Sequence, residues 1–225
     1  MTNLPTNEHL LHLHEYSLLP EKREIFIHSH IDGEDEGGVD YRSAVSLIKN
    51  MRYLTSTSKD PVFIHMHIIG GDWEDCLAMY DTIRLSKVNT TILGYGKIQS
   101  SSGVLFQAAN NRIMMPNATL LIHYGSISFD SEHSKAAASS VEWNEKESDK
   151  MIDIFVNRCI KSPIAKEKNS KNSTHIIKKH IISQIKNKCD WILNANEAVY
   201  YGFADGILGS RKFPDIESLK NKCKP

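Results

Sequence analysis

Three polar side chains in this sequence could together perform nucleophilic acyl transfer: Ser100, His123 and Asp190. Ser100 opens a run of three serines, His123 follows the apolar run 119–122, and Asp190 precedes Trp191. A serine hydroxyl becomes a useful nucleophile when a base removes its proton, and an imidazole does this best when a carboxylate orients it. The three residues provide that set, in the chain order Ser, His, Asp.

The serine run leaves Ser101 and Ser102 as alternatives to Ser100, and such a run by itself is typical of a helix cap. A helix that starts after Ser100 aims the N–H of Ser101 and the positive helix end at developing negative charge. The pair Gly70-Gly71, at an expected strand-to-helix junction, presents a second N–H without side-chain obstruction. Together the two N–H groups would form an oxyanion hole, in which each donor is often worth about 3–4 kcal/mol.

Strand-like and helix-like apolar segments alternate along the chain, which predicts a largely parallel sheet covered by helices. The expected strands are 25–32, 62–68, 90–93, 113–115 and 120–123. The expected helices are 41–53, 72–85, 104–109, 134–159, 176–185 and 196–201. We expect residues 1–22 to form a flexible N-terminal arm, residues 23–210 a single α/β domain, and residues 211–225 a C-terminal tail.

Composition excludes several classes of function. The 225 residues are 40% hydrophobic and 24% charged, as in an ordinary soluble domain with a substantial core. Because 27 basic residues balance 27 acidic ones, nucleic-acid binding has no electrostatic support, and the Lys-rich segment 161–188 is expected to be a solvated face. We expect neither a signal peptide nor a membrane span. The four cysteines lack a CxxC pair, which predicts free thiols in a reducing, cytoplasmic location.

Two His-x-His pairs, His28/His30 and His65/His67, lie on expected strands. Strand alternation places both members of a pair on one face, as a metal site requires. No cysteine or carboxylate is clearly placed beside either pair, so an exposed or interface face is the preferred interpretation and a metal site is the alternative. No metal or organic cofactor is expected.

The order and spacing of the motifs resemble the proteolytic subunit of the Clp protease family, especially its phage-like variants, over residues 23–208. No single motif establishes the resemblance, which rests on the order and spacing of all the motifs together. The motifs are Ile31-Asp32, Gly70-Gly71, Met79-Tyr80-Asp81-Thr82-Ile83, Gly96-x-x-x-Ser100, Ala108-Ala109, Arg112 to Pro116-Asn117-Ala118, Ile122-His123, and Asp190-x-x-Leu193-x-Ala195-x-Glu197-Ala198-x-x-Tyr201-Gly202-x-x-Asp205.

The resemblance implies an α/β, ClpP/crotonase-like spiral of βαβ units, with residues 134–159 as a projecting helical handle. It places the nucleophile on Ser100, the general base on His123 and the orienting acid on Asp190, with Asp205 as a rival for the acid. The oxyanion-hole donors that the resemblance implies are Gly71 and Ser101.

The resemblance also implies an ATP-dependent serine endopeptidase that acts on unfolded polypeptides or peptides. The active sites would face the chamber of a homo-oligomeric ring, either one heptamer or two stacked heptamers, and a AAA+ unfoldase would consume the ATP. Within the helix 134–159, the side chains of Trp143, Met151, Ile152 and Phe155 form more apolar surface than a solvated helix carries. We expect that surface to be buried against another subunit.

Some positions depart from the family pattern. Lys97 and Ser101 replace a small residue and a methionine that flank the family's motif. Cys189 replaces an arginine that helps couple two stacked rings, so weak stacking is expected. His65 replaces an aromatic residue of the pocket that receives the ATPase, which leaves the partner's identity open.

Three other functions stay open. A stand-alone, phage-type capsid or scaffold maturation protease would keep the triad without an ATPase. A catalytically inactive ring subunit would keep the fold alone. An acyl-CoA hydratase or isomerase shares the fold class but relies on backbone donors with acidic residues, and the Ser100–His123 pair disfavours it.

Overall fold

The computed structural model describes residues 7–28, 38–126, 133–167 and 174–222. Within these ranges eight strands form one mixed sheet, in the order β1-β2-β3-β4-β5-β8, with β6 and β7 branching from β4. The strands are β1 Leu18–Leu19, β2 Glu24–His28, β3 Val62–Ile68, β4 Thr90–Gln99, β5 Asn111–Met114, β6 Thr119–Ile122, β7 Trp191–Asn194 and β8 Gly206–Ile207. The pairs β1–β2 and β6–β7 are antiparallel and the other pairs are parallel.

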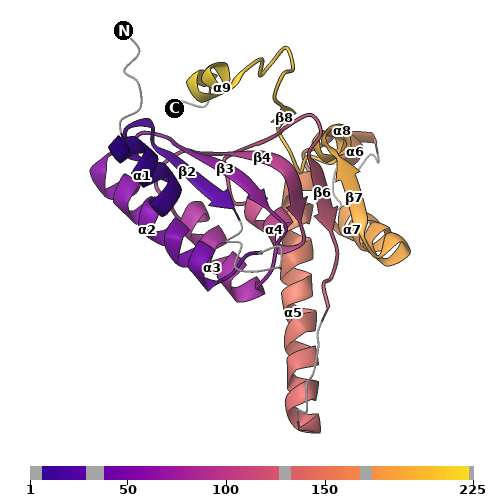
Figure 1. The fold of residues 1–225 in the computed structure, drawn as a ribbon. Helices are drawn as coiled ribbons and strands as arrows, with labels where there is room; N and C mark the ends of the chain where they lie inside the picture. The colour runs from indigo at the N-terminus through magenta and orange to yellow at the C-terminus, as the bar shows by residue number, and fades with distance from the viewer. Residues whose placement is uncertain (1–6, 29–37, 127–132, 168–173, 223–225) are drawn as a thin grey trace.

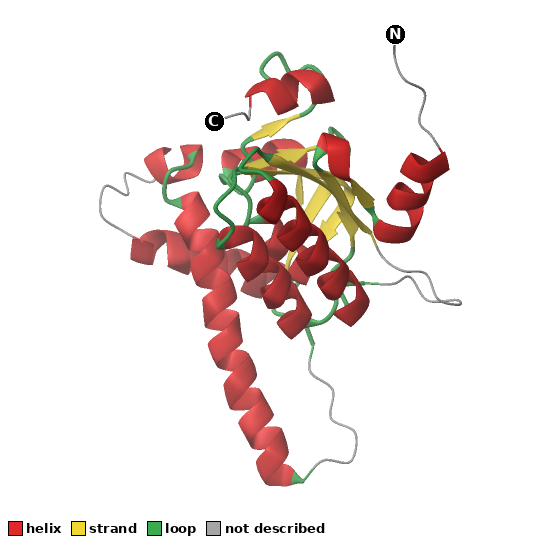
Figure 2. Ribbon diagram, turned by 90° about the vertical axis from the view of Figure 1, so that its left-hand side faces the viewer, coloured by secondary structure: helices red, strands yellow, loops and turns green. Residues whose placement is uncertain are grey.

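The helices cover this sheet and form a second layer beside it (Figures 1 and 2). They are α1 Asn7–Tyr16, α2 Tyr41–Thr57, α3 Trp73–Arg84, α4 Ser101–Phe106, α5 Ser134–Cys159, α6 Pro163–Glu167, α7 Thr174–Lys188, α8 Ala195–Tyr200 and α9 Ile216–Lys222, with a 3-10 turn at Pro20–Lys22. Parallel neighbours joined through α2 and α3 form successive βαβ units. The predicted α/β fold is confirmed.

The strand β4 divides the sheet into two parts. Its first half, from Thr91 to Gly94, pairs with β5. Its second half, from Lys97 to Gln99, pairs with β6. The sequence predicted a strand only over 90–93, because two glycines and several polar residues interrupt the apolar pattern beyond Leu93. The longer strand is what carries the chain from one part of the sheet to the other.

The predicted handle is present as α5, which has the bounds expected from the sequence and projects away from the sheet (Figure 1). Its apolar surface lies elsewhere than expected. Met151, Ile152 and Phe155 are buried in this chain's own core rather than left for another subunit. Of the large apolar side chains described on α5, Val141 and Trp143 stay exposed, at 42% and 55%. Any contact made by the projecting half is therefore smaller than the sequence suggested.

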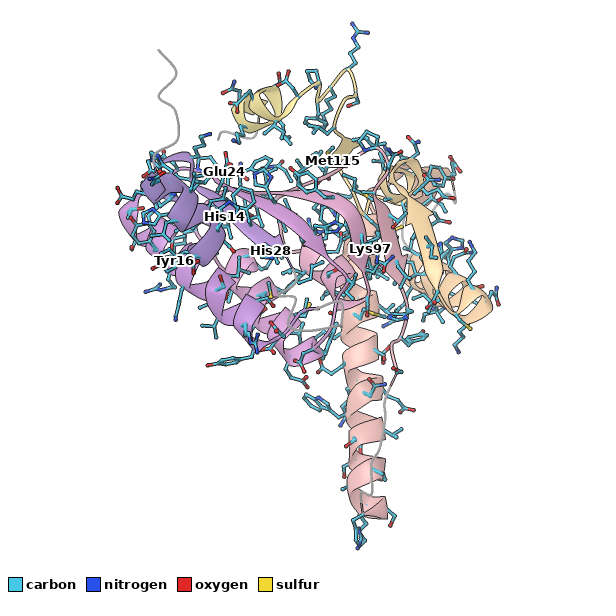
Figure 3. The ribbon with its side chains drawn as sticks, in the orientation of Figure 1. His14, Tyr16, Glu24, His28, Lys97 and Met115 are labelled. Carbon is cyan, nitrogen blue, oxygen red and sulfur yellow. The ribbon has the colours of Figure 1, made fainter. Side chains whose placement is uncertain are left out.

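Both ends of the described chain are more ordered than predicted. Residues 7–16, expected in a flexible arm, form α1, and Asn50 on α2 donates a hydrogen bond to the Tyr16 carbonyl. Figure 3 shows His14 and Tyr16 on this helix. Residues 211–222, expected in a tail, include α9, where Leu219 is fully buried.

The C-terminal segment, from Phe213 through α9, closes a small second core. Phe213 and Leu219 pack with Phe63, Leu93 and Ile113 from three neighbouring strands. These strand positions face away from the main core, so they need a cover from outside the sheet, and the C-terminal segment supplies it. Because Phe213 and Leu219 are flanked by short polar stretches, the sequence did not indicate that they cover this core.

A polar contact joins α9 to β2. Glu24, 5% exposed, accepts hydrogen bonds from Lys220 on α9 and pairs with His65 Nε2 at 3.3 Å. Burial raises the pKa of Glu24, but the hydrogen bonds to His65 and Lys220 and the charges of both partners outweigh it, so the pKa is lowered from its ordinary value of 4.5. Figure 3 shows Glu24 at the start of β2.

No helix in the described ranges has the length and hydropathy that a membrane crossing would need.

The Glu24 contact predicts a pH-dependent gain in stability. A lowered folded-state pKa stabilises the fold fully above the ordinary value, and this stabilisation is lost as the pH falls through the folded-state pKa. Glu24→Gln should therefore lower the free energy of unfolding at pH 7, and the gap to wild type should narrow and then close as the pH falls below 4.5 and through the lowered pKa. Urea titrations of both proteins over this range measure the gap. A gap independent of pH would contradict the assignment.

Candidate active site

Ser100 occupies the turn between β4 and α4. Its backbone has φ 57°, a region that residues other than glycine rarely adopt. Two hydrogen bonds hold the turn: the Ser100 N–H donates to the Leu121 carbonyl (3.0 Å), and the Gly103 N–H donates to the Ser100 carbonyl (2.9 Å). A sharp strand-to-helix turn of this kind presents a side chain at the edge of a sheet.

Strand pairing brings His123 and Asp190 together across the sheet. Ile122 on β6 pairs with Trp191 on β7 in an antiparallel ladder, so the next residues outward, His123 and Asp190, lie opposite each other. His123 Nδ1 is 3.0 Å from Asp190 Oδ1, and His123 Nε2 is 2.7 Å from Ser100 Oγ. The three residues singled out in the sequence thus form one connected chain of hydrogen bonds.

The Asp190 side chain is 59% exposed and that of His123 is 30% exposed. Solvent therefore screens the charge of the carboxylate. The contact between Asp190 and His123 is therefore an oriented hydrogen bond more than a strong ion pair.

The two neighbouring serines have other partners. Ser102 is fully buried, and its hydroxyl lies 2.7 Å from the carbonyl oxygens of both Ile68 and Gln99. The Ser101 hydroxyl accepts a hydrogen bond from the Gly71 N–H (2.9 Å). Among the described contacts, Ser100 is the serine of the run whose hydroxyl reaches His123.

A buried thiol lies close to the serine turn. Cys76 Sγ donates to the Ser101 carbonyl at 3.0 Å, and burial raises the pKa of this thiol to about 12. The thiol therefore stays protonated at neutral pH and is no rival nucleophile. Cys159 and Cys189 are also free, as predicted, while Cys223 lies outside the described residues.

A cavity of about 550 Å³ adjoins Ser100. Its walls come from the two glycines at the end of β3, from the serine turn, and from α3 and α5. Trp73 on α3 crosses to α5, where its Nε1 donates to Glu147 Oε2 (2.7 Å), and Lys150 Nζ approaches both oxygens of the same carboxylate at 2.8 and 2.9 Å. Burial raises the pKa of Glu147, but the hydrogen bonds from Lys150 and Trp73 outweigh it and lower the pKa overall.

This Trp73–Glu147–Lys150 network has little signature in the local sequence. Glu147 and Lys150 are three residues apart, the spacing of an ordinary exposed ion pair on a helix. The burial of Glu147, at 6% exposure, and its contact with Trp73 depend on how α3 packs beside α5. Only the tertiary structure brings these residues to the cavity.

Asp205, the rival for the orienting acid, has a structural partner. Its carboxylate receives hydrogen bonds from Arg112 Nε (3.0 Å) and Nη2 (2.6 Å), and its N–H donates to the Arg112 carbonyl. This pair fastens the chain before β8 to β5, away from His123.

The His-x-His pairs have different surroundings. His65 stacks on Phe26, with ring centroids 4.4 Å apart, and its Nδ1 lies 2.8 Å from Tyr95 Oη. His28 ends β2 (Figure 3), and its partner His30 lies outside the described residues. Among the residues that the structure describes, no group of three or more His, Cys, Asp or Glu side chains could hold a metal ion.

An α/β sheet that carries a connected Ser–His–Asp set beside a cavity is the architecture of a serine hydrolase. The Clp protease family model matches residues 7–211, and the chain belongs to that family. The sequence resemblance is thereby confirmed.

Named relatives support the same family. The chain is 27% identical over 206 residues to ATP-dependent Clp protease proteolytic subunit 2 of Pseudomonas aeruginosa, covering 89% of this chain and 87% of the relative. It is 28% identical over 179 residues to the subunit of the same name from Treponema denticola, covering 78% and 80%. A solved ClpP1 mutant from Listeria monocytogenes has the same fold, with a TM-score of 0.59 and 22% identity over 85% of this chain and 94% of that one.

Ser102 offers a test of the serine turn. Because its buried hydroxyl is the donor near the Ile68 and Gln99 carbonyls, Ser102→Ala should lower the free energy of unfolding by about 1–3 kcal/mol. Ser100→Ala, which removes no contact to a buried carbonyl, should cost less. Denaturant titration of both variants measures the difference. A Ser102→Ala protein as stable as wild type would contradict the structural role of this hydroxyl.

Proposed function

We propose that this protein is a serine endopeptidase of the Clp type, with Ser100, His123 and Asp190 as its catalytic triad. The observation that carries the proposal is the unbroken hydrogen-bonded chain from Ser100 Oγ through both nitrogens of His123 to Asp190, in a member of the Clp protease family. Peptide hydrolysis fits these groups because each has a defined task in acyl transfer.

In the proposed reaction, Ser100 Oγ attacks the peptide carbonyl carbon while His123 Nε2 takes the hydroxyl proton. Asp190 accepts a hydrogen bond from His123 Nδ1–H and so fixes the tautomer with Nε2 free to act as the base. The N–H groups of Gly71 and Ser101 stabilise the oxyanion of the tetrahedral intermediate.

The intermediate collapses when His123 returns the proton to the leaving amine, and the C–N bond breaks to give an acyl-enzyme on Ser100. A water molecule then attacks the ester, with His123 again as the base, and releases the carboxylic acid and the serine. The reaction requires neither a metal nor an organic cofactor.

We further propose that the substrates are unfolded polypeptides and peptides, and that the subunits form a cytoplasmic ring of seven, alone or as two stacked rings. ATP would be used by a separate AAA+ unfoldase; the names of the relatives, which include the words ATP-dependent, support this. With Cys189 at the position of the ring-coupling arginine, stacking should be weak. The exposed apolar residues Val141 and Trp143 on α5 fit a contact between subunits.

An active-site serine probe tests the catalytic assignment. A fluorophosphonate should label Ser100 in the wild type, and Ser100→Ala should abolish both labelling and peptide hydrolysis because the nucleophile is lost. His123→Ala should cost several orders of magnitude in rate, and Asp190→Asn should also be severe. Peptide mapping by mass spectrometry locates the label.

The matched control is Ser183→Ala, which changes an exposed serine on α7 far along the chain from the turn. This variant should be labelled like the wild type. Labelling that persists in Ser100→Ala would move the nucleophile to another serine, and a folded wild type that resists the probe would indicate an inactive ring subunit.

Assembly is tested by native mass spectrometry. The wild type should give a seven-subunit species, with the double ring sensitive to salt. Trp143→Ser should weaken subunit association without loss of secondary structure, since the indole is exposed in the single chain. A stable monomer at micromolar concentration would contradict the chambered arrangement.

A further inference from the structure

The N–H of Gly71, one of the two proposed oxyanion donors, is already occupied by a side chain. It donates to Ser101 Oγ at 2.9 Å, and the same hydroxyl lies 3.2 Å from the Gly71 carbonyl oxygen, to which it donates. Ser101 is 6% exposed, so its hydroxyl depends on these protein partners more than on bulk water. A single residue thus has both of its backbone polar groups bonded to one hydroxyl.

The hydrogen bonds on the other side of Gly71 explain why its N–H and carbonyl face the Ser101 hydroxyl. The Val39 N–H donates to the Gly70 carbonyl (2.5 Å), and the Asp72 N–H donates to the Val39 carbonyl (2.8 Å). These two bonds flank Gly71 in a parallel bridge with Val39, so the N–H and carbonyl of Gly71 itself lie on the other side, toward the serine turn and the cavity. The Ser101 hydroxyl occupies that side.

Neither partner is free to move aside easily. A Cβ at Gly71 would come within 2.2 Å of the Val39 carbonyl oxygen, which shows how closely the two segments approach. On the other side, Cys76 Sγ donates to the Ser101 carbonyl and helps to hold the first turn of α4. The movable element is the Ser101 hydroxyl, which can change rotamer at χ1 without a change in the backbone.

We propose that the Ser101 hydroxyl caps the Gly71 N–H in the resting protein, and that the carbonyl oxygen of a substrate must displace this hydroxyl before the two-donor oxyanion hole forms. The proposal rests on the proposed peptidase function and deepens it. Ser101 then has two opposed roles: its N–H is an oxyanion donor, and its side chain competes with the oxyanion for the other donor.

The size of the effect follows from the bond that is exchanged. A neutral hydrogen bond between a hydroxyl and an amide adds only a modest net free energy. The need to break the bond between the Ser101 hydroxyl and the Gly71 N–H should therefore slow the formation of tetrahedral adducts about three- to tenfold. This reduction in rate should appear in kcat, because the Ser101 hydroxyl competes with the negative charge that develops on the carbonyl oxygen after the substrate has bound.

Ser101→Ala removes the hydroxyl and keeps the N–H. In Ser101→Ala, fluorophosphonate should label Ser100 about three- to tenfold faster than in the wild type, with kcat for a peptide substrate raised and KM unchanged. Ser183→Ala, which changes an exposed serine on α7 and leaves the serine turn untouched, should be labelled at the wild-type rate. A labelling rate in Ser101→Ala that is equal to the wild type, or slower, would overturn the proposal, because the hydroxyl would then be neutral or would support the hole.

Amide hydrogen exchange tests the cap independently of catalysis. The Gly71 N–H should be protected in the wild type and in Ser183→Ala, and should exchange faster in Ser101→Ala, while the neighbouring Asp72 N–H stays protected by Val39. Unchanged exchange at Gly71 would refute the cap even in a protein with no peptidase activity. If exchange at Gly71 differs between the wild type and Ser101→Ala but the wild type never reacts with the fluorophosphonate, the cap is supported and the proposed function is refuted.

Discussion

The position of β6 between β4 and β7 is the constraint on which the rest of the site depends. Its parallel register with the end of β4 sets Leu121 beside Gln99, and its antiparallel register with β7 sets Ile122 beside Trp191. Ser100, His123 and Asp190 each lie one residue beyond a paired position. A slip of one residue in either register would turn a side chain to the opposite face and break the chain of hydrogen bonds.

Much of this arrangement could be predicted from local sequence. The bounds of α5 followed from sustained helical spacing, and the apolar run before His123 indicated a strand. The strain at Ser100 could not be predicted, because only the ladders on both sides of the turn force a serine to positive φ. Nor could the role of the C-terminal segment, whose buried residues Phe213 and Leu219 matter only because β3, β4 and β5 present an apolar face that needs a cover.

The helix α5 joins two environments in one element. Its C-terminal half belongs to the core through Ile152 and Phe155, and its N-terminal half stands clear of the sheet. Between the two halves, Glu147 receives the Trp73 indole from α3 at the edge of the cavity. This hydrogen bond therefore ties the wall of the cavity to the helix that projects from the sheet.

The second core also has a consequence for the order of synthesis. A ribosome releases Phe63, Leu93 and Ile113 long before Phe213 and Leu219, the residues that cover them. A nascent chain thus displays an apolar patch on one face of its sheet until the last helix emerges. That patch is a natural docking point for a chaperone and, in a chain whose translation stops early, a signal for aggregation or disposal.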